Sequence, residues 1–244
     1  MKNNLMSYYC LNQIMLLLLV FFLSCLSLSV PYDIQRAIEK RLTKVTQSRS
    51  SPLSQSWYKA KQQHVSSAQK KAISTYWNIS GITLKYNETL RLDCIFQKKY
   101  EHFVLDIGFG LGDSCIYMAE RNPLSGYLGV EIHRSGIGSA LIKIHSSDRP
   151  CDYSNIRVVR SDVAMLLDHL EDQSLDEVSI FFPDPWPNTE RDEQRRVMRP
   201  AMVEVISKKI KSGGLLRLAT DVEDYARYAA DTMVSFNDKG WLCR

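Results

Sequence analysis

The sequence predicts an α/β fold built on a doubly wound, mostly parallel sheet. From about residue 88 onward, short apolar runs that are typical of strands alternate with segments of helical periodicity. Three glycines at alternate positions follow one of these runs, and an acidic residue stands at or just after the end of each of five runs. Strands that alternate with helices imply right-handed crossovers, and therefore neighbouring strands that run parallel.

The expected elements follow one another in a regular order. The strands are predicted at 103–107, 127–131, 155–160, 176–182 and 214–219. The helices are predicted at 113–121, 136–146, 163–170, 198–211 and 222–235. Because ligands of such sheets bind beyond the carboxyl ends of the strands, the residues at those ends are the candidates for function.

Composition favours one catalytic domain, which we assign to residues 81–244. The chain is 45% hydrophobic and 24% charged, which is ordinary for a globular protein of 244 residues. Its six cysteines form no C-x-x-C pair and its five histidines are scattered, so we expect no metal site and no disulfide framework.

The first 29 residues read as a signal peptide. Lys2 precedes an intense apolar run, Ile14 to Leu23, and the small residues Ser27 and Ser29 suit a cleavage site near residue 29. Cleavage would leave no stable membrane association. The alternative is a signal anchor in an internal membrane, because the 17 residues from 14 to 30 come close to the length that spans a bilayer.

Residues 30–80 have the composition of a transit peptide or a linker. Between Pro31 and Trp77, nine lysines and arginines stand against only Asp33 and Glu39, and glycine is absent. After a signal peptide, this basic and serine-rich segment predicts an organelle, such as a plastid with extra membranes. A solvated linker and a basic helix that contacts nucleic-acid phosphates are the alternatives.

The glycine cluster predicts a nucleotide-binding turn at Gly108, Gly110 and Gly112. Glycine permits positive φ and lets a ligand approach the backbone N–H groups. The spacing is G-x-G-x-G, whereas the dinucleotide fingerprint has its third glycine one residue later, where this chain has Asp113. The spacing therefore argues against NAD, and a tight turn with no ligand is the alternative.

Five acids mark the strand ends. They are Asp106, Glu131, Asp162, Asp184 and Asp221. A carboxylate at Glu131 can accept hydrogen bonds from both hydroxyls of a ribose, and Asp162 is placed to meet an adenine edge. Any one acid could instead cap the next helix, but five in succession favour a ligand site.

These motifs resemble those of the class I S-adenosylmethionine-dependent methyltransferases, and among them the tRNA (guanine-N7)-methyltransferases. The resemblance covers roughly residues 93–233. It rests on Leu-Asp-Ile-Gly-Phe-Gly at 105–110, Gly-Val-Glu-Ile-His at 129–133 followed by Gly-Ile-Gly at 136–138, Phe-Phe-Pro-Asp-Pro-Trp at 181–186 and Ala-Thr-Asp at 219–221. The Pro-Asp-Pro-Trp motif is the most discriminating of them.

The resemblance implies a Rossmann-like fold, S-adenosylmethionine as cofactor, tRNA as partner and methylation of guanine N7. The implied cofactor-binding residues are Asp106, Gly108, Gly110, Gly112, Glu131, Asp162 and Val163. Asp184 would act between cofactor and base, while Asp221, Arg195 and Arg196 would contact the substrate. Guanine N7 bears a lone pair and no proton, so the reaction needs positioning and carboxylates that stabilise the developing charge, with no general base.

Two departures from the family keep alternatives open. The loop at 187–196 is one residue longer than usual and carries three acids, which favours another RNA or a small molecule as substrate. The family's C-terminal substrate motif is absent and the chain stops where a sixth strand is expected, so we expect the C-terminal strands to be missing. A non-catalytic remnant that binds cofactor is therefore a further alternative. No motif in the sequence shows whether the protein needs a partner subunit.

Overall fold

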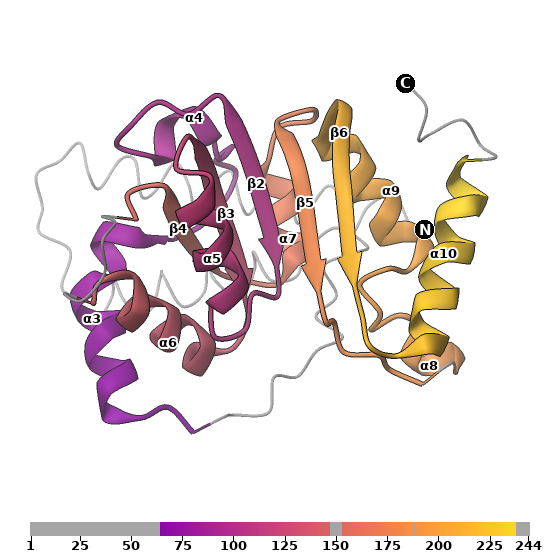
Figure 1. Ribbon diagram of the computed structural model, residues 1–244, viewed down its shortest axis with the longest axis horizontal. Coiled ribbons are helices and arrows are strands. Elements are labelled where there is room, and N and C mark those ends of the chain that lie inside the picture. The colour runs from indigo at the N-terminus through magenta and orange to yellow at the C-terminus, as the bar shows by residue number, and fades with distance from the viewer. Residues whose placement is uncertain (1–63, 147–152, 188, 238–244) are drawn as a thin grey trace, which may run out of the picture. The chain divides into compact units, whose positions relative to one another are not determined.

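A computed structural model describes residues 64–146, 153–187 and 189–237 of the chain. Within these residues, six strands form one sheet in the order β1-β4-β3-β2-β5-β6, and every neighbouring pair is parallel (Figure 1). The strands are β1 (Gly81–Ile82), β2 (His102–Ile107), β3 (Ser125–Glu131), β4 (Ile156–Arg160), β5 (Leu175–Phe181) and β6 (Ile210–Ala219). The predicted doubly wound parallel fold is thereby confirmed.

Helices connect the strands in the predicted alternation. They are α3 (Ser67–Ser80), α4 (Leu92–Ile95), α5 (Asp113–Arg121), α6 (Arg134–Ile144), α7 (Val163–His169), α8 (Glu190–Glu193), α9 (Pro200–Lys209) and α10 (Glu223–Asn237). The helix expected over 198–211 is shorter than predicted. Pro200 stands in its first turn, where no N–H is needed, and Ile210 already pairs with Leu175 as the start of β6.

Two hydrophobic cores lie on the two faces of the sheet. Alternate residues of β2 point to opposite faces, so that Val104 packs in the core beneath α3, α5 and α6. Leu105 packs in the core beneath α7, α9 and α10. Both residues are almost completely buried, at 2% and 0% exposure. Helices on both faces leave only the ends of the strands open to ligands.

Helix α3 lies inside the segment that composition assigned to a transit peptide or linker. Ser66 and Gln69 form a reciprocal capping box at its first turn. The helix packs on α6, where Gln69 Nε2 donates to Ser139 Oγ at 3.0 Å, and Ala72 is buried. Gly138 of α6 makes this approach possible, because a Cβ there would lie 2.5 Å from Gln69 Cβ. The folded part of the chain therefore begins before residue 81.

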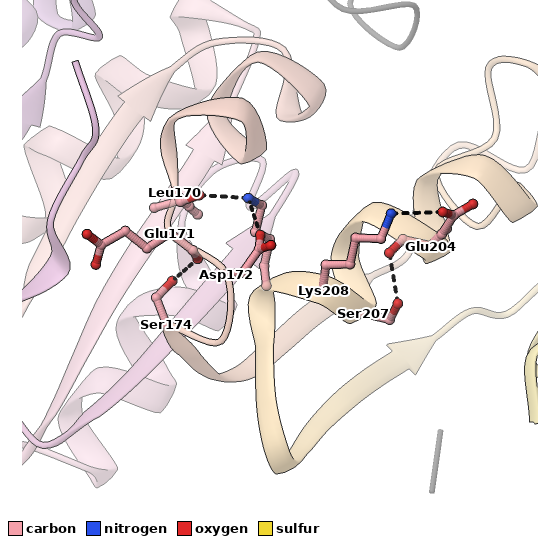
Figure 2. Close-up of polar contacts among 8 residues, drawn as sticks. Leu170, Glu171, Asp172, Ser174, Glu204, Ser207 and Lys208 are labelled. Carbon is pink, nitrogen blue, oxygen red and sulfur yellow. Dashed lines mark hydrogen bonds and ion pairs between the residues drawn. The ribbon is translucent and has the colours of Figure 1, made fainter. Parts of the chain in front are cut away.

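Hydrogen bonds to the turn that follows α7 join the amino-terminal end of β6 to that of β5 (Figure 2). Lys209 Nζ donates to the Leu170 carbonyl and to Asp172 Oδ1, both at 2.7 Å. The Ser174 hydroxyl closes the same turn by donating to the Glu171 carbonyl at 2.8 Å. In α9, Lys208 Nζ donates to Glu204 Oε1 at 2.9 Å. The contacts of Lys209 fix the end of the sheet that lies opposite the strand ends considered below, whereas the Lys208–Glu204 pair lies within α9.

β6 is one of the two edge strands of the described sheet, and Leu215 on it is 52% exposed. No strand follows α10 in the part of the chain that the structure describes, and residues 238–244 lie outside that part. Residues 1–63, with the predicted signal peptide and most of the basic segment, also lie outside it. Among the helices that are described, none has the length and apolarity needed to cross a membrane.

Candidate ligand-binding site

A cavity of about 450 Å³ opens at the carboxyl ends of the central strands, where the sequence places its candidate residues. It lies at the switch point of the sheet, since the crossovers from β2 and from β5 lead in opposite directions. The residues predicted to be functional that line it are Gly108, Gly110, Glu131, Asp162, Val163, Asp184 and Arg195. The structure therefore brings together seven of the eleven candidates, while Asp106, Gly112, Arg196 and Asp221 do not line the cavity.

The glycine turn borders the cavity with bare backbone. Gly108, Gly110 and Gly112 all have positive φ, at 72°, 58° and 87°. A Cβ added at Gly108 or Gly110 would meet no atom within 4 Å, so the space beside both is open to a ligand. A Cβ at Gly112 would instead lie 2.8 Å from Ala140 Cβ. The first two glycines therefore suit ligand binding, and the third permits α5 and α6 to pack closely.

Glu131 holds the glycine turn in addition to lining the cavity. Its Oε2 accepts from Gly110 N at 3.0 Å, and its Oε1 accepts from Ile132 N and His133 N at 2.7 and 2.8 Å. The side chain is 7% exposed. A carboxylate has about four lone-pair positions, so three backbone bonds leave roughly one for a ligand hydroxyl. Sequence reasoning predicted the ligand role of Glu131 and missed this structural one.

Gly136 allows α6 to begin against the glycine turn. A Cβ at this position would lie 2.4 Å from the Gly110 carbonyl oxygen. It would also lie 3.2 Å from Glu131 Cγ. Gly136 is thus a further residue of the site, and its place in Gly136-Ile137-Gly138 is the sequence signal that could have found it.

Asp162 acts as a helix cap and faces the cavity at the same time. Its Oδ1 accepts from Ala164 N at 2.8 Å and so caps α7. One hydrogen bond leaves most of the lone pairs of this half-buried carboxylate available to a ligand. The two readings of this acid from the sequence, cap and ligand contact, are therefore compatible.

Asp106 lies buried at the end of β2 and is 1% exposed. Neither of its carboxyl oxygens has a hydrogen-bond partner among the described residues. Burial raises the pKa of Asp106 from 3.8 to about 7, and the charge of Glu131 acts in the same direction, although the side chains of Cys115 and Ser114 oppose the shift. A buried acid whose carboxyl oxygens make no hydrogen bond of good geometry, although the Cys115 and Ser114 side chains lie near it, is an unusual feature of a folded protein and marks a candidate for function.

We expect Asp106→Asn to stabilise the ligand-free protein more at pH 8 than at pH 4. Because the pKa in the folded state lies above the unfolded value, the folded protein holds an extra proton between about pH 4 and pH 7. The wild-type free energy of unfolding therefore falls as the pH rises through this window, by a few kcal/mol at most. Urea unfolding of both proteins at several pH values measures the difference. A stability difference between the two proteins that does not change with pH would contradict the assignment.

A buried arginine, Arg196, binds the backbone of the Pro-Asp-Pro-Trp turn. Arg196 is 3% exposed, and its Nε and Nη2 donate to the Trp186 carbonyl at 2.9 and 2.7 Å. Its guanidinium also lies 4.3 Å from the centre of the Tyr228 ring and 5.7 Å from that of Tyr225. The substrate contact predicted for Arg196 does not match this placement, since the side chain is enclosed and bound to the turn that carries Asp184.

Arg195 and Asp184 are oriented toward the cavity instead. Asp184 is exposed on the turn. The Arg195 guanidinium lies 4.4 Å from the centre of the Trp186 ring, and its Nη1 lies 3.7 Å from Asp192 Oδ1. One of the three acids of the loop, Asp192, thus forms part of the surroundings of Arg195. Thr189 begins α8, where its Oγ1 accepts from Asp192 N at 3.2 Å.

Asp221 is exposed beyond the end of β6 and lies outside the cavity. The neighbouring Thr220 lines a second, mostly apolar hollow between β6 and α10. Phe182 lines both this hollow and the cavity. It belongs to the Phe-Phe-Pro-Asp-Pro-Trp motif, but no role was assigned to it from the sequence. Among the residues that the structure describes, no group of three His, Cys, Asp or Glu side chains could hold a metal ion.

Comparison with known proteins supplies an independent finding. Residues 100–239 match the family model described as "Putative methyltransferase". The chain is 38% identical over 166 residues to the tRNA (guanine-N(7)-)-methyltransferase of Halorhodospira halophila, which covers 68% of this chain and 69% of that protein. It is 42% identical over 160 residues to the enzyme of the same name from Nitrosococcus oceani, covering 65% of each chain. For that from Yersinia enterocolitica the identity is 34% over 179 residues, covering 72% of each.

Proposed function

Because this chain belongs to the tRNA (guanine-N7)-methyltransferase family, we propose that it transfers a methyl group from S-adenosylmethionine to N7 of a guanine in tRNA. The observation that carries the proposal is the cavity at the carboxyl ends of the central strands. There, open glycine backbone and the acids Glu131 and Asp162 stand opposite the Pro-Asp-Pro-Trp turn with Asp184. The glycine turn, Glu131 and Asp162 form a first wall, which suits a nucleoside cofactor. The Pro-Asp-Pro-Trp turn forms the second wall and carries the family's substrate motif.

The residues of the first wall fit S-adenosylmethionine. Gly108 and Gly110 leave room for a ligand against the backbone, and the remaining lone pairs of Glu131 and Asp162 can accept from ribose hydroxyls and an adenine amino group. Asp106 lies beneath the turn and bears an unpartnered carboxyl, which suits a cationic group. When bound, S-adenosylmethionine supplies a methyl group on a positively charged sulfur.

The second wall has to orient the base and stabilise charge. The N7 lone pair lies in the plane of guanine and carries no proton, so no general base is required. As the bond from N7 to the methyl carbon forms and the carbon–sulfur bond breaks, the positive charge passes from sulfur to the purine. The carboxylate of Asp184 would stabilise that charge; the support for this role is that Asp184 is exposed on a turn whose Trp186 carbonyl is bound by Arg196.

The long loop after the turn favours a second candidate, methylation of a different RNA. Arg195 is the one predicted phosphate contact that lines the cavity, and it already lies near Asp192. An RNA phosphate would have to compete with this carboxylate for the guanidinium. A smaller RNA that makes fewer phosphate contacts would depend less on the outcome of that competition.

We propose an organelle, such as a plastid, as the site of action, with an internal membrane as the alternative. The support is compositional: an apolar run at 14–30 followed by a basic, serine-rich segment. Fusion of residues 1–80 to a fluorescent protein tests the proposal. Uniform fluorescence throughout the cytosol would contradict it, and an intact N-terminus in the mature protein would favour the membrane anchor.

The activity has a direct test in two stages. Isothermal titration should show binding of S-adenosylmethionine and none of NAD. Incubation with S-adenosylmethionine and unmodified tRNA should then yield 7-methylguanosine, detected by mass spectrometry of the nucleosides. Binding of the cofactor with no 7-methylguanosine in tRNA would overturn the substrate. A lack of cofactor binding by a protein that unfolds cooperatively would overturn the reaction class.

A further inference from the structure

Phe182 has two features that seldom occur together in a large apolar residue. The residue is 68% exposed, although aromatic residues of this size usually bury most of their surface. Its φ is +50°, in the left-handed region that L-residues other than Asn and Asp rarely adopt. A glycine would fit this backbone at lower cost, so neither packing nor backbone conformation explains a phenylalanine here.

The backbone of Phe182 is held in this conformation from both sides. Its N–H donates to the Ala219 carbonyl at 2.8 Å and so extends the pairing of β5 and β6 by one residue. Four residues later, the Trp186 carbonyl is bound to the buried Arg196. Because both ends of the segment are fixed, the ring is kept at the surface rather than turned into the core.

The ring lies where the two halves of the site meet. Phe182 lines the cavity together with Asp184 and the glycine turn, and it also lines the hollow beside Thr220. A planar ligand that enters between these two hollows would find one aromatic face at their common border. The carboxylate of Asp184 would lie two residues farther along the chain.

We propose that Phe182 is the aromatic platform on which the acceptor purine stacks while its N7 receives the methyl group. The proposal rests on the proposed function, and it names a residue that orients the base. Proteins commonly hold unpaired bases by stacking them on aromatic side chains. Stacking would place the ring plane, and with it the in-plane N7 lone pair, at a fixed angle to the methyl group.

The charge balance of the reaction makes an aromatic ring more suitable than an aliphatic side chain. Methyl transfer leaves the neutral thioether S-adenosylhomocysteine and a purine that carries the positive charge. The π face of an aromatic ring attracts a cation, whereas a leucine of similar size does not. The interaction therefore strengthens as the reaction proceeds, and Phe182 should act on kcat more than on KM.

The test is a series of side chains at position 182 that changes the π face and the bulk separately. Phe182→Tyr and Phe182→Trp keep an aromatic face, Phe182→Leu keeps the apolar bulk alone, and Phe182→Ala removes both. Leu124→Ala is the matched control, because Leu124 is also exposed, at 84%, and precedes β3 at the opposite end of the sheet. For each protein we would measure S-adenosylmethionine affinity, the urea midpoint and the single-turnover rate on tRNA.

We expect the Tyr and Trp variants to stay within about threefold of wild type, and the Leu and Ala variants to lose on the order of tenfold or more in single-turnover rate. Cofactor affinity should stay within about twofold throughout, and Leu124→Ala should match wild type. A Phe182→Leu protein that methylates tRNA as fast as wild type would overturn the proposal. So would an Ala variant that loses cofactor affinity in parallel with rate, because the ring would then serve the fold.

A binding measurement separates this proposal from the function on which it rests. If the wild type produces no 7-methylguanosine, the proposed function fails, and titration of the S-adenosylhomocysteine complex with 7-methylguanosine 5′-monophosphate decides the role of Phe182. Binding that weakens about tenfold in Phe182→Leu would support the platform. Equal binding by both proteins, or no binding by either, would overturn it.

Discussion

Replacing Asp184 by alanine is expected to lower the single-turnover rate of methyl transfer by about 10²–10³, the usual cost of removing one preorganised group that stabilises charge. Cofactor affinity should change little, because Asp184 is exposed at the rim and makes no hydrogen bond with the glycine turn. Isothermal titration and rapid-quench kinetics on tRNA would measure the two quantities.

Two further variants test whether the loss of rate in Asp184→Ala comes from its charge and from its position in the cavity. Asp184→Asn keeps the shape and removes the charge, so it should lose nearly as much rate as the alanine variant. Asp221→Ala removes an exposed acid that lies outside the cavity, and we expect its effect to appear mainly in KM for tRNA. Full activity of Asp184→Ala would refute the catalytic assignment, and equal kinetic effects at both sites would assign the two acids a common role.

Replacing Arg196 by methionine is expected to destabilise the protein and to slow methylation without weakening cofactor binding. The change removes two charge-assisted hydrogen bonds to the Trp186 carbonyl and leaves that oxygen without its donor, which costs about 1–3 kcal/mol. Arg196→Lys should recover only part of the loss, because an ammonium cannot reproduce the two-pronged contact. Urea unfolding and kcat on tRNA are the measurements.

The adjacent arginine is the matched control for this prediction. The Arg195 side chain is 30% exposed, so Arg195→Met should change the free energy of unfolding by less than about 0.5 kcal/mol. If Arg195 contacts a phosphate, its loss should raise KM for tRNA and make tRNA binding less dependent on salt. Equal losses of stability in the two variants would mean that Arg196 is no more important to the turn than its neighbour.

Five of the six strands, and the helices α5, α6, α7, α9 and α10, could be predicted because apolar periodicity marks them, whereas the two-residue strand β1 was not predicted. The glycines and acids at the strand ends followed from the rule that a parallel sheet gathers its carboxyl ends at one edge. Helix α3 was missed because its composition is basic and polar. It is stable through its capping box and its packing on α6, and neither shows in a count of charges.

The sequence could not predict which of the candidate residues line the cavity and which are buried behind it. Arg195 and Arg196 are the same residue type at adjacent positions, yet one lines the cavity and the other is buried under Tyr228. Asp106 lies beneath the turn rather than in the wall of the cavity. Phe182 combines a positive φ with a hydrogen bond to Ala219, 37 residues later in the chain, and no local pattern encodes such a contact.

The three backbone hydrogen bonds of Glu131 have a consequence for how a ligand is captured. They hold Gly110 and the residues after β3 in place in the absence of any cofactor. Glycine-rich loops commonly lose much conformational entropy when they close on a ligand, and that loss weakens binding. Here the entropy is already lost when the chain folds, so the free energy of cofactor contacts can appear almost entirely as affinity.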